Sequence, residues 1–241
     1  MSKKSDERAA KAAEALRQQQ RAERRRTQLS VLGVVLAMVL IIGAGFAIQR
    51  ARDDSTEVAA PTAAQAEYGV TIGDADAPHQ VVIYEDFLCP FCGELEAASH
   101  ERLAKLAEQG KVQVDYRPFD LLSRISDYPV RATNAFAVVL DAAGPEVAKK
   151  FHDLIYASQP SESGPFPDDD WLVEKAVEAG ATEADVRPGI EDLSMKSWVT
   201  EATQAAIDAG VNGTPTVLVD GKVVQDASMQ ELADSIIAQV E

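Results

Sequence analysis

Two cysteines separated by two residues, in the segment Cys89-Pro90-Phe91-Cys92, restrict the possible folds of this chain more than any other feature. They are the only cysteines among 241 residues. An apolar run at residues 81–84 comes just before them, and a helical pattern covers residues 94–109 just after them. A strand followed by C-x-x-C at the start of a helix is typical of a thiol–disulfide redox site.

The position of the two thiols predicts different chemistry for each. The first turn of a helix has unpaired backbone N–H groups and the positive end of the helix dipole, and both favour an anion. We therefore expect Cys89 to be the exposed nucleophile with a lowered pKa, and Cys92 to be the resolving thiol. Pro90 suits the first helical turn because that turn needs no N–H from it.

Two other interpretations of the cysteine pair stay open. A purely structural disulfide would close a very short loop and would constrain the unfolded chain little. A metal site would need two more ligands, and the three histidines, His79, His100 and His152, show no ligand spacing. We expect them to be surface or packing residues. We expect no metal, and no cofactor other than the cysteine pair itself.

Charge divides the chain into unlike parts. Residues 1–28 carry nine basic and four acidic side chains, residues 29–48 carry no charge, and residues 49–241 carry a net charge of −21. Twenty uncharged residues in a helix span about 30 Å, the thickness of a bilayer core. The positive-inside rule then predicts a basic cytoplasmic tail at 1–28, a single membrane anchor at 29–48 and an exported remainder. The acidic remainder is a poor nucleic-acid binder.

A cleaved signal peptide is the alternative for the apolar segment, with Gly45-Phe46-Ala47 as the cleavage region. The apolar run is longer than an ordinary signal core, which favours the uncleaved anchor. Residues 49–67 are small and polar, and they predict a flexible linker between the membrane and a folded domain at 68–241.

The folded domain is predicted to alternate strands and helices with a helical block in the middle. Gly, Pro and the Asp220-Gly221 turn divide it into segments. The predicted strands are 68–72, 81–86, 111–119, 216–220 and 222–225. The predicted helices are 94–109, 129–143, 145–158, 168–179, a short one opening at 182–185, 190–209, and 228–240 with Ser228 as its N-cap.

Two motifs together resemble the DsbA-like branch of the thioredoxin superfamily. They are Asp86-Phe87 before the C-x-x-C, and the run 211–217, Val-Asn-Gly-Thr-Pro-Thr-Val, before the last hairpin. The resemblance covers residues 68–241. It implies an α/β thioredoxin fold, with β-α-β and β-β-α halves and an all-helical insertion at about 127–209. It also implies that Pro215 follows a cis peptide bond, lies beside the cysteines and belongs with them to the catalytic site.

The same resemblance suggests how substrates bind. The backbone at Thr214 offers hydrogen bonds to an extended peptide. Apart from the resemblance, Phe87, Leu88 and Phe91 surround the cysteines and predict an apolar patch for unfolded substrates, with Phe91 and Pro90 as the expected substrate contacts. Ordinary packing is an equal alternative for Phe87 and a weaker one for Phe91.

The sequence departs from the family at one position. Many relatives have a buried acid six residues before the first cysteine, where this chain has Ile83. Two roles are open for the nearby Asp86: proton transfer from Cys92, or capping of the active-site helix. Negative charge at Glu85 and Asp86 opposes a low thiolate pKa.

Three functions are compatible with these features. The favoured one is a membrane-tethered, extracytoplasmic thiol:disulfide oxidoreductase that forms disulfides in exported proteins. Its partners are cysteine-bearing proteins that are unfolded or partly folded, and a membrane redox partner that reoxidises the pair. The alternatives are a reductase or isomerase, and a non-enzymatic anchored binding domain with a structural disulfide. No dimerisation domain is visible in the sequence, so we expect a monomer.

Overall fold

The computed structural model describes residues 58–61 and 68–241. The structure described below is that of the compact unit that these residues form. The predicted cytoplasmic tail and membrane anchor, and most of the predicted linker, lie outside the described residues. Among the helices that the structure describes, none has the length and apolar character needed to cross a bilayer.

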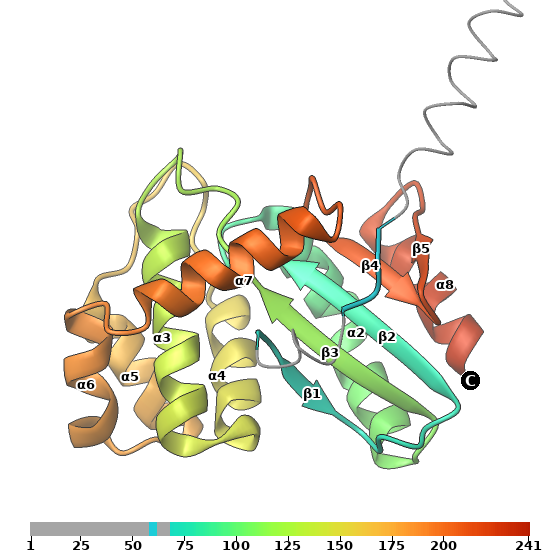
Figure 1. The fold of residues 1–241 in the computed structure, drawn as a ribbon, viewed down its shortest axis with the longest axis horizontal. Coiled ribbons are helices and arrows are strands. Elements are labelled where there is room, and N and C mark those ends of the chain that lie inside the picture. Colours follow the sequence, from blue (N-terminus) through green and yellow to red (C-terminus); the bar gives the residue numbers. More distant parts are fainter. Residues whose placement is uncertain (1–57, 62–67) are drawn as a thin grey trace, which may run out of the picture. The chain divides into compact units, whose positions relative to one another are not determined.

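Five strands form one mixed sheet in the order β1-β3-β2-β4-β5 (Figure 1). Strands β2 and β3 run parallel, and the other neighbouring pairs are antiparallel. All five predicted strands are confirmed, each within two residues of its expected ends. Their bounds are β1 Val70–Ile72, β2 His79–Glu85, β3 Val112–Pro118, β4 Thr216–Val219 and β5 Lys222–Val224.

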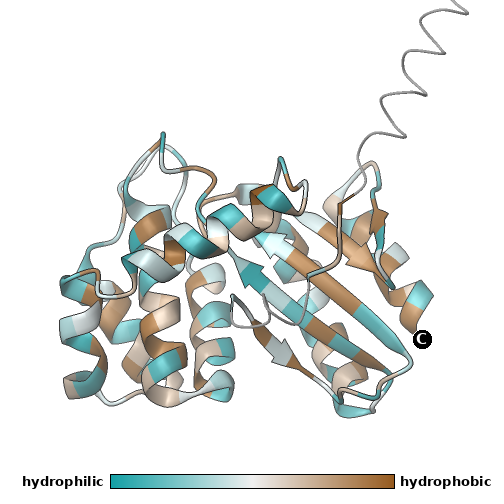
Figure 2. Cartoon of the chain, viewed as in Figure 1, coloured by the Kyte–Doolittle hydropathy of each residue, from teal (hydrophilic) through white to brown (hydrophobic). Residues whose placement is uncertain are grey.

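The central strand β2 is buried on both faces. Val81 and Ile83 face the main core, which also holds buried residues of α2 (Pro90–Glu108) and α8 (Met229–Val240). The alternate residues Val82 and Tyr84 belong to a second, smaller cluster. Side chains alternate between the faces of a sheet, so a strand covered on both sides needs a continuous apolar run. Figure 2 shows this run along the middle of β2.

Five helices between β3 and β4 form the predicted insertion. They are α3 Tyr128–Ala143, α4 Pro145–Ala157, α5 Asp169–Ala179, α6 Glu183–Glu191 and α7 Lys196–Asp208. Figure 1 shows α3 to α6 grouped at one end of the sheet, while α7 runs from this group toward β4. Ala206 near the end of α7 packs in the second cluster with Val82 and Leu218 of the sheet.

The prediction of one helix over 190–209 is wrong. Ile190 belongs to α6, and α7 starts only at Lys196. Between them Leu193 has a φ of 52°, which interrupts the helical path. The remaining predicted helices are confirmed, and α2 starts at Pro90, so that Pro90 occupies its first turn.

The resulting architecture is a thioredoxin fold. Strand β2, α2 and β3 form the β-α-β half, and β4, β5 and α8 form the β-β-α half. The insertion joins the two halves. Because α2 begins directly after the central strand, the C-x-x-C motif lies at the end of the sheet that β2 runs toward.

Candidate active site

Cys89 is the N-cap residue of α2, with an extended backbone at φ −68° and ψ 116°. Its N–H donates to the carbonyl of Asp86 at 2.9 Å, which closes the turn between β2 and the helix. Its own carbonyl accepts from the N–H of Cys92 at 3.0 Å and begins the helix. Both thiols are free in this structure. The predicted placement of the motif at the first helical turn is therefore confirmed.

The expectation that Cys89 is exposed is wrong, since only 4% of the residue is accessible. The covering segment comes from the loop before β4. In the protonated thiol form, the Sγ atom of Cys89 donates to the carbonyl oxygen of Thr214 at 3.2 Å. The peptide bond between Thr214 and Pro215 is cis, as the family resemblance implies. Residues far apart in the chain thus meet at the sulfur, and their roles toward substrate stay predictions.

The two thiols have opposite acidities. The hydrogen bond with Cys92 is the largest cause that lowers the pKa of Cys89, to about 6; burial opposes it, and Thr214 and the N–H groups of Cys92 and Phe91 assist. Burial raises the pKa of Cys92 well above its usual value, and the hydrogen bond and charge of Cys89 and the charge of Glu85 add to this. Near neutral pH Cys89 is therefore a thiolate and Cys92 a thiol.

Only part of the apolar surface that was predicted beside the two cysteines is exposed. Phe91 is 55% exposed and Pro90 is also exposed, so both can contact another molecule. Phe87 and Leu88 are buried, with Phe87 packed against the rings of Phe136 and Tyr156. Phe87 and Leu88 are packing residues, and the candidate substrate contact is the Pro90-Phe91 pair.

Asp86 joins the active-site turn to a second loop. Its buried carboxylate accepts from the N–H of Leu88 at 2.8 Å, and from those of Leu121 and Leu122 at 2.8 and 2.9 Å. The capping hypothesis is wrong, because the helix N-cap is Cys89 and no side chain caps it. Burial raises the pKa of Asp86 to about 6 against these three bonds. Proton transfer by Asp86 stays a prediction, while its contacts show that it holds the two loops together.

Comparison with known proteins identifies the family. Residues 65–239 match the profile of the Thioredoxin family. The chain belongs to the thioredoxin family. Its relatives include "Probable disulfide bond formation protein D" of Bacillus cereus, 28% identical over 211 residues that cover 81% of this chain and 90% of that protein.

Solved structures of DsbA-like proteins share the thioredoxin fold of this chain. Oxidised DsbA of Mycobacterium tuberculosis is 28% identical with a TM-score of 0.58, and the match covers 72% of this chain and all of that one. Oxidised BdbD of Bacillus subtilis, at 18% identity and a TM-score of 0.65, supports the fold alone; the match covers 77% of this chain and 98% of that one. The likeness to DsbA of Mycobacterium tuberculosis, together with the curated relatives, supports a DsbA-like member of the thioredoxin family.

This thioredoxin-family member has a buried acid–base cluster behind the cysteines that the sequence analysis did not find. His152 of α4 is fully buried, and its Nε2 lies 2.6 Å from Oε1 of Glu85, the last residue of β2. Its Nδ1 lies 2.9 Å from Oδ1 of Asp153. Burial lowers the pKa of His152, but Glu85 and then Asp153 outweigh it and raise that pKa to about 9. His152 was predicted to be a surface or packing residue; it is buried and forms an ion pair with Glu85.

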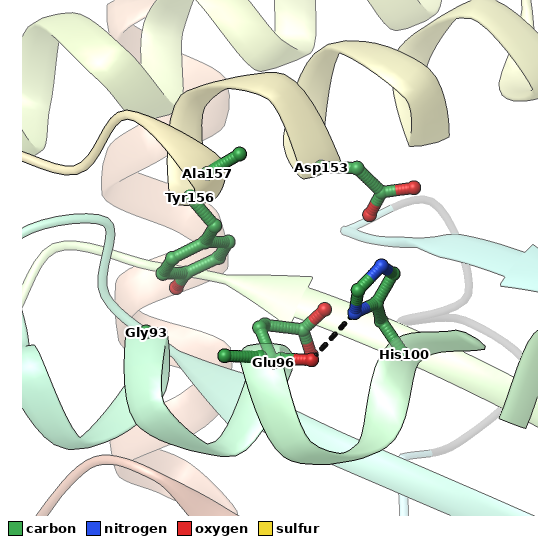
Figure 3. Close-up of a pocket in the computed structure, with 7 residues that line it drawn as sticks. Gly93, Glu96, His100, Asp153, Tyr156 and Ala157 are labelled. Atoms are coloured by element: carbon green, nitrogen blue, oxygen red, sulfur yellow. Dashed lines mark hydrogen bonds between the residues drawn. The ribbon is translucent and has the colours of Figure 1, made fainter. Parts of the chain in front are cut away.

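Glu96 completes this cluster from α2. Neither of its carboxyl oxygens has a hydrogen-bond partner among the described residues, although the residue is buried. Glu96 lines a cavity of about 240 Å³ between α2 and α4, with Gly93, Ala97, His100, Asp153, Tyr156 and Ala157 (Figure 3). The lining of this cavity is mostly apolar, and the Glu96 carboxyl group is a buried polar group within it. A sequence signal existed: Cys92, Glu96, Ser99 and Leu103 follow helical spacing on the buried face of α2.

The cluster also bears on metal binding. One ligand atom each from Glu85, Glu96 and His152 lies within 4.8 Å of the others, which is compatible with a metal ion. However, the 2.6 Å contact joins His152 and Glu85 directly, and a bound cation at about 2.0–2.2 Å from each atom would have to part them. The geometry is that of a buried ion pair with a neighbouring carboxyl group.

Proposed function

We propose that this protein is a membrane-tethered, extracytoplasmic thiol:disulfide oxidoreductase that forms disulfides in exported proteins. The protein is a thiol:disulfide oxidoreductase whose redox-active group is the Cys89/Cys92 pair, without a further cofactor. The observation that carries the proposed chemistry is the geometry of the pair: Cys89 is the N-cap of α2 and contacts the Thr214 carbonyl before the cis peptide bond to Pro215, and Cys92 is buried behind it. In this arrangement the pKa of Cys89 is lowered to about 6 and that of Cys92 is raised. The curated relatives named for disulfide bond formation support the same activity.

The lowered pKa favours oxidation of substrates over their reduction. A stabilised Cys89 thiolate stabilises the reduced form of the pair, and a pair with a stable reduced form is a stronger oxidant. The same thiolate is a good leaving group when a mixed disulfide is resolved. A reductase would benefit from the opposite arrangement.

The reaction requires two exchange steps. A substrate thiolate attacks Sγ of Cys89, the Cys89–Cys92 bond breaks, and Cys92 leaves and takes up a proton. A second substrate thiolate then attacks the substrate sulfur of the mixed disulfide, which forms the new disulfide and releases the Cys89 thiolate. The substrate has lost two electrons, and the enzyme disulfide has gained them and become a dithiol. A membrane redox partner that accepts two electrons restores the pair.

Contacts around Cys89 suit an extended cysteine-bearing substrate. The Thr214 carbonyl faces Sγ of Cys89, and the exposed Phe91 and Pro90 lie in the first turn of α2. An unfolded chain provides both a free backbone edge and apolar side chains for such contacts. Folded proteins with buried cysteines are poorer substrates for this arrangement.

The decisive experiment mixes the oxidised full-length protein with a reduced, unfolded protein that has two cysteines. We expect one substrate disulfide to form for each oxidised pair, with loss of activity in Cys89→Ser. The equilibrium with glutathione should lie toward reduced enzyme and oxidised glutathione. If the oxidised protein leaves substrate thiols intact, while the reduced protein readily cleaves substrate disulfides, the enzyme is a reductase and the proposal is wrong.

A further inference from the structure

The side chain of Gln159, in the helical insertion, forms hydrogen bonds with the active-site turn. Gln159 lies just beyond the end of α4, and its own N–H donates to the carbonyl of Tyr156 at 3.1 Å. Its side-chain Nε2 donates to the carbonyl of Phe87 at 3.0 Å and to the carbonyl of Cys89 at 2.9 Å. The contacts link parts of the chain that are 72 and 70 residues apart.

The chemistry of the contacts fixes the orientation of the amide. Both partners are carbonyl oxygens, which only accept, so the NH₂ group must face them and Oε1 must point away. Oε1 points at Gly93 in the first turns of α2. A Cβ atom at residue 93 would overlap Oε1, and it would lie 3.1 Å from Cδ of Gln159. Gly93 therefore leaves the space that the glutamine side chain fills.

The contacts of Gln159 hold the backbone next to the reactive sulfur of Cys89. The carbonyl of Cys89 accepts from the N–H of Cys92 and of Gly93 as well as from Gln159. The position of this carbonyl fixes the first turn of α2, whose N–H groups at Phe91 and Cys92 stabilise the Cys89 thiolate. The second bond, to Phe87, fixes the turn just before the cysteine.

We propose that Gln159 is a positioning residue, which locks the turn from Phe87 to Cys89 so that the Cys89 sulfur keeps its stabilising hydrogen bonds, and that Gly93 is glycine to admit it. The insertion is thereby coupled to the redox chemistry through one side chain. The inference rests on thiol–disulfide chemistry at the pair, and not on the direction of exchange or on the location of the protein.

The experiment measures the Cys89 thiolate in the reduced full-length protein. Gln159→Ala removes both hydrogen bonds, so the turn should loosen and the pH midpoint of Cys89 alkylation should rise. We expect alkylation at pH 6 to slow by about threefold to tenfold, the range for one or two hydrogen bonds. The glutathione equilibrium should move by a similar factor toward oxidised enzyme. Gln159→Glu places a carboxylate against two carbonyl oxygens. It should therefore shift the alkylation midpoint and the glutathione equilibrium in the same direction as Gln159→Ala, and further.

A double-mutant cycle tests the pairing with Gly93. Gly93→Ala alone should displace the flexible glutamine end and shift the Cys89 midpoint upward, as Gln159→Ala does. In the Gln159→Ala background, Gly93→Ala should shift the midpoint little further, because the hydrogen bonds of Gln159 are already absent. Gln230→Ala, at an exposed glutamine of α8, is the matched control and should shift neither quantity.

Two results would overturn the inference. One is an unchanged alkylation midpoint and glutathione equilibrium in Gln159→Ala; a loss of urea stability alone would show only a structural contact. The other is full additivity of the two single changes, which would separate Gly93 from Gln159. Failure of the wild-type protein to oxidise substrates would reject the proposed function but leave these measurements interpretable.

Discussion

Glu96 is a carboxyl group whose burial couples protonation to stability. Burial is the main cause that raises its pKa, to about 7; the neighbouring His152 lowers it, and Glu85 raises it further. The folded chain therefore binds the Glu96 proton more tightly than the unfolded chain, whose ordinary value is 4.5. Stability is lost as pH rises from about 4.5 to about 7, and this loss is complete above pH 7.

Glu96→Gln should remove that pH dependence. The amide keeps the shape of the protonated acid and has no charge to bury. We expect the variant to gain stability relative to the wild type as pH rises from 5 to 8, on the order of 1 kcal/mol or more, because one pKa unit corresponds to about 1.4 kcal/mol. Urea unfolding at a series of pH values measures it. Glu101→Gln, an exposed position on the same helix, is the control. Parallel curves for Glu96→Gln and wild type would contradict the raised pKa.

The sequence predicted some residues of the site well and missed others. Cys89, Cys92 and Pro215 lie in short motifs, so their identity and order were readable. His152 and Gln159 act through contacts to Glu85 and Cys89 across 67 and 70 residues. Such pairings depend on how α4 packs against the sheet, and no local spacing records that. The 4% exposure of Cys89 was missed for the same reason, because its cover comes from Thr214.

At the scale of elements, glycine residues after helices and a serine before the last helix made most helix ends predictable. Gly144 and Gly180 have positive φ angles of 84° and 116° and follow the ends of α3 and α5, as their sequence positions indicated. The N-cap at Ser228 is confirmed, since its side chain accepts from the N–H of Glu231. The break between α6 and α7 has neither glycine nor proline. There Leu193 adopts a positive φ, which tertiary packing must favour over local preference.

Helix α4 has a central role among the elements. It brings His152 and Tyr156 to the core side of the C-x-x-C motif, and the chain leaving it carries Gln159 to the carbonyl of Cys89. Figure 3 shows α4 facing α2 across the cavity that Glu96 lines. The insertion therefore contacts the turn that carries the C-x-x-C motif.

At the scale of the whole molecule, the uneven charge of the chain predicts its topology. From the basic tail at 1–28 before the apolar segment at 29–48, we expect a cytoplasmic N-terminus and an exported domain. Protease added to intact cells should therefore digest the domain and spare a tag on the N-terminus. The matched control uses lysed cells, in which both parts should be cut. A domain protected in intact cells would contradict the anchored, exported topology.

The different acidities of the two thiols are the basis of the proposed chemistry. Cys89 should ionise with a pKa near 6, while Cys92 stays a thiol until far higher pH. The full-length reduced protein is alkylated with iodoacetamide at a series of pH values, and the modified residue is identified by peptide mass. We predict that Cys89 reacts first, with a midpoint near pH 6 and a plateau above pH 7. Modification of Cys92 first, or a Cys89 midpoint near the ordinary thiol value of about 8.5, would contradict the account.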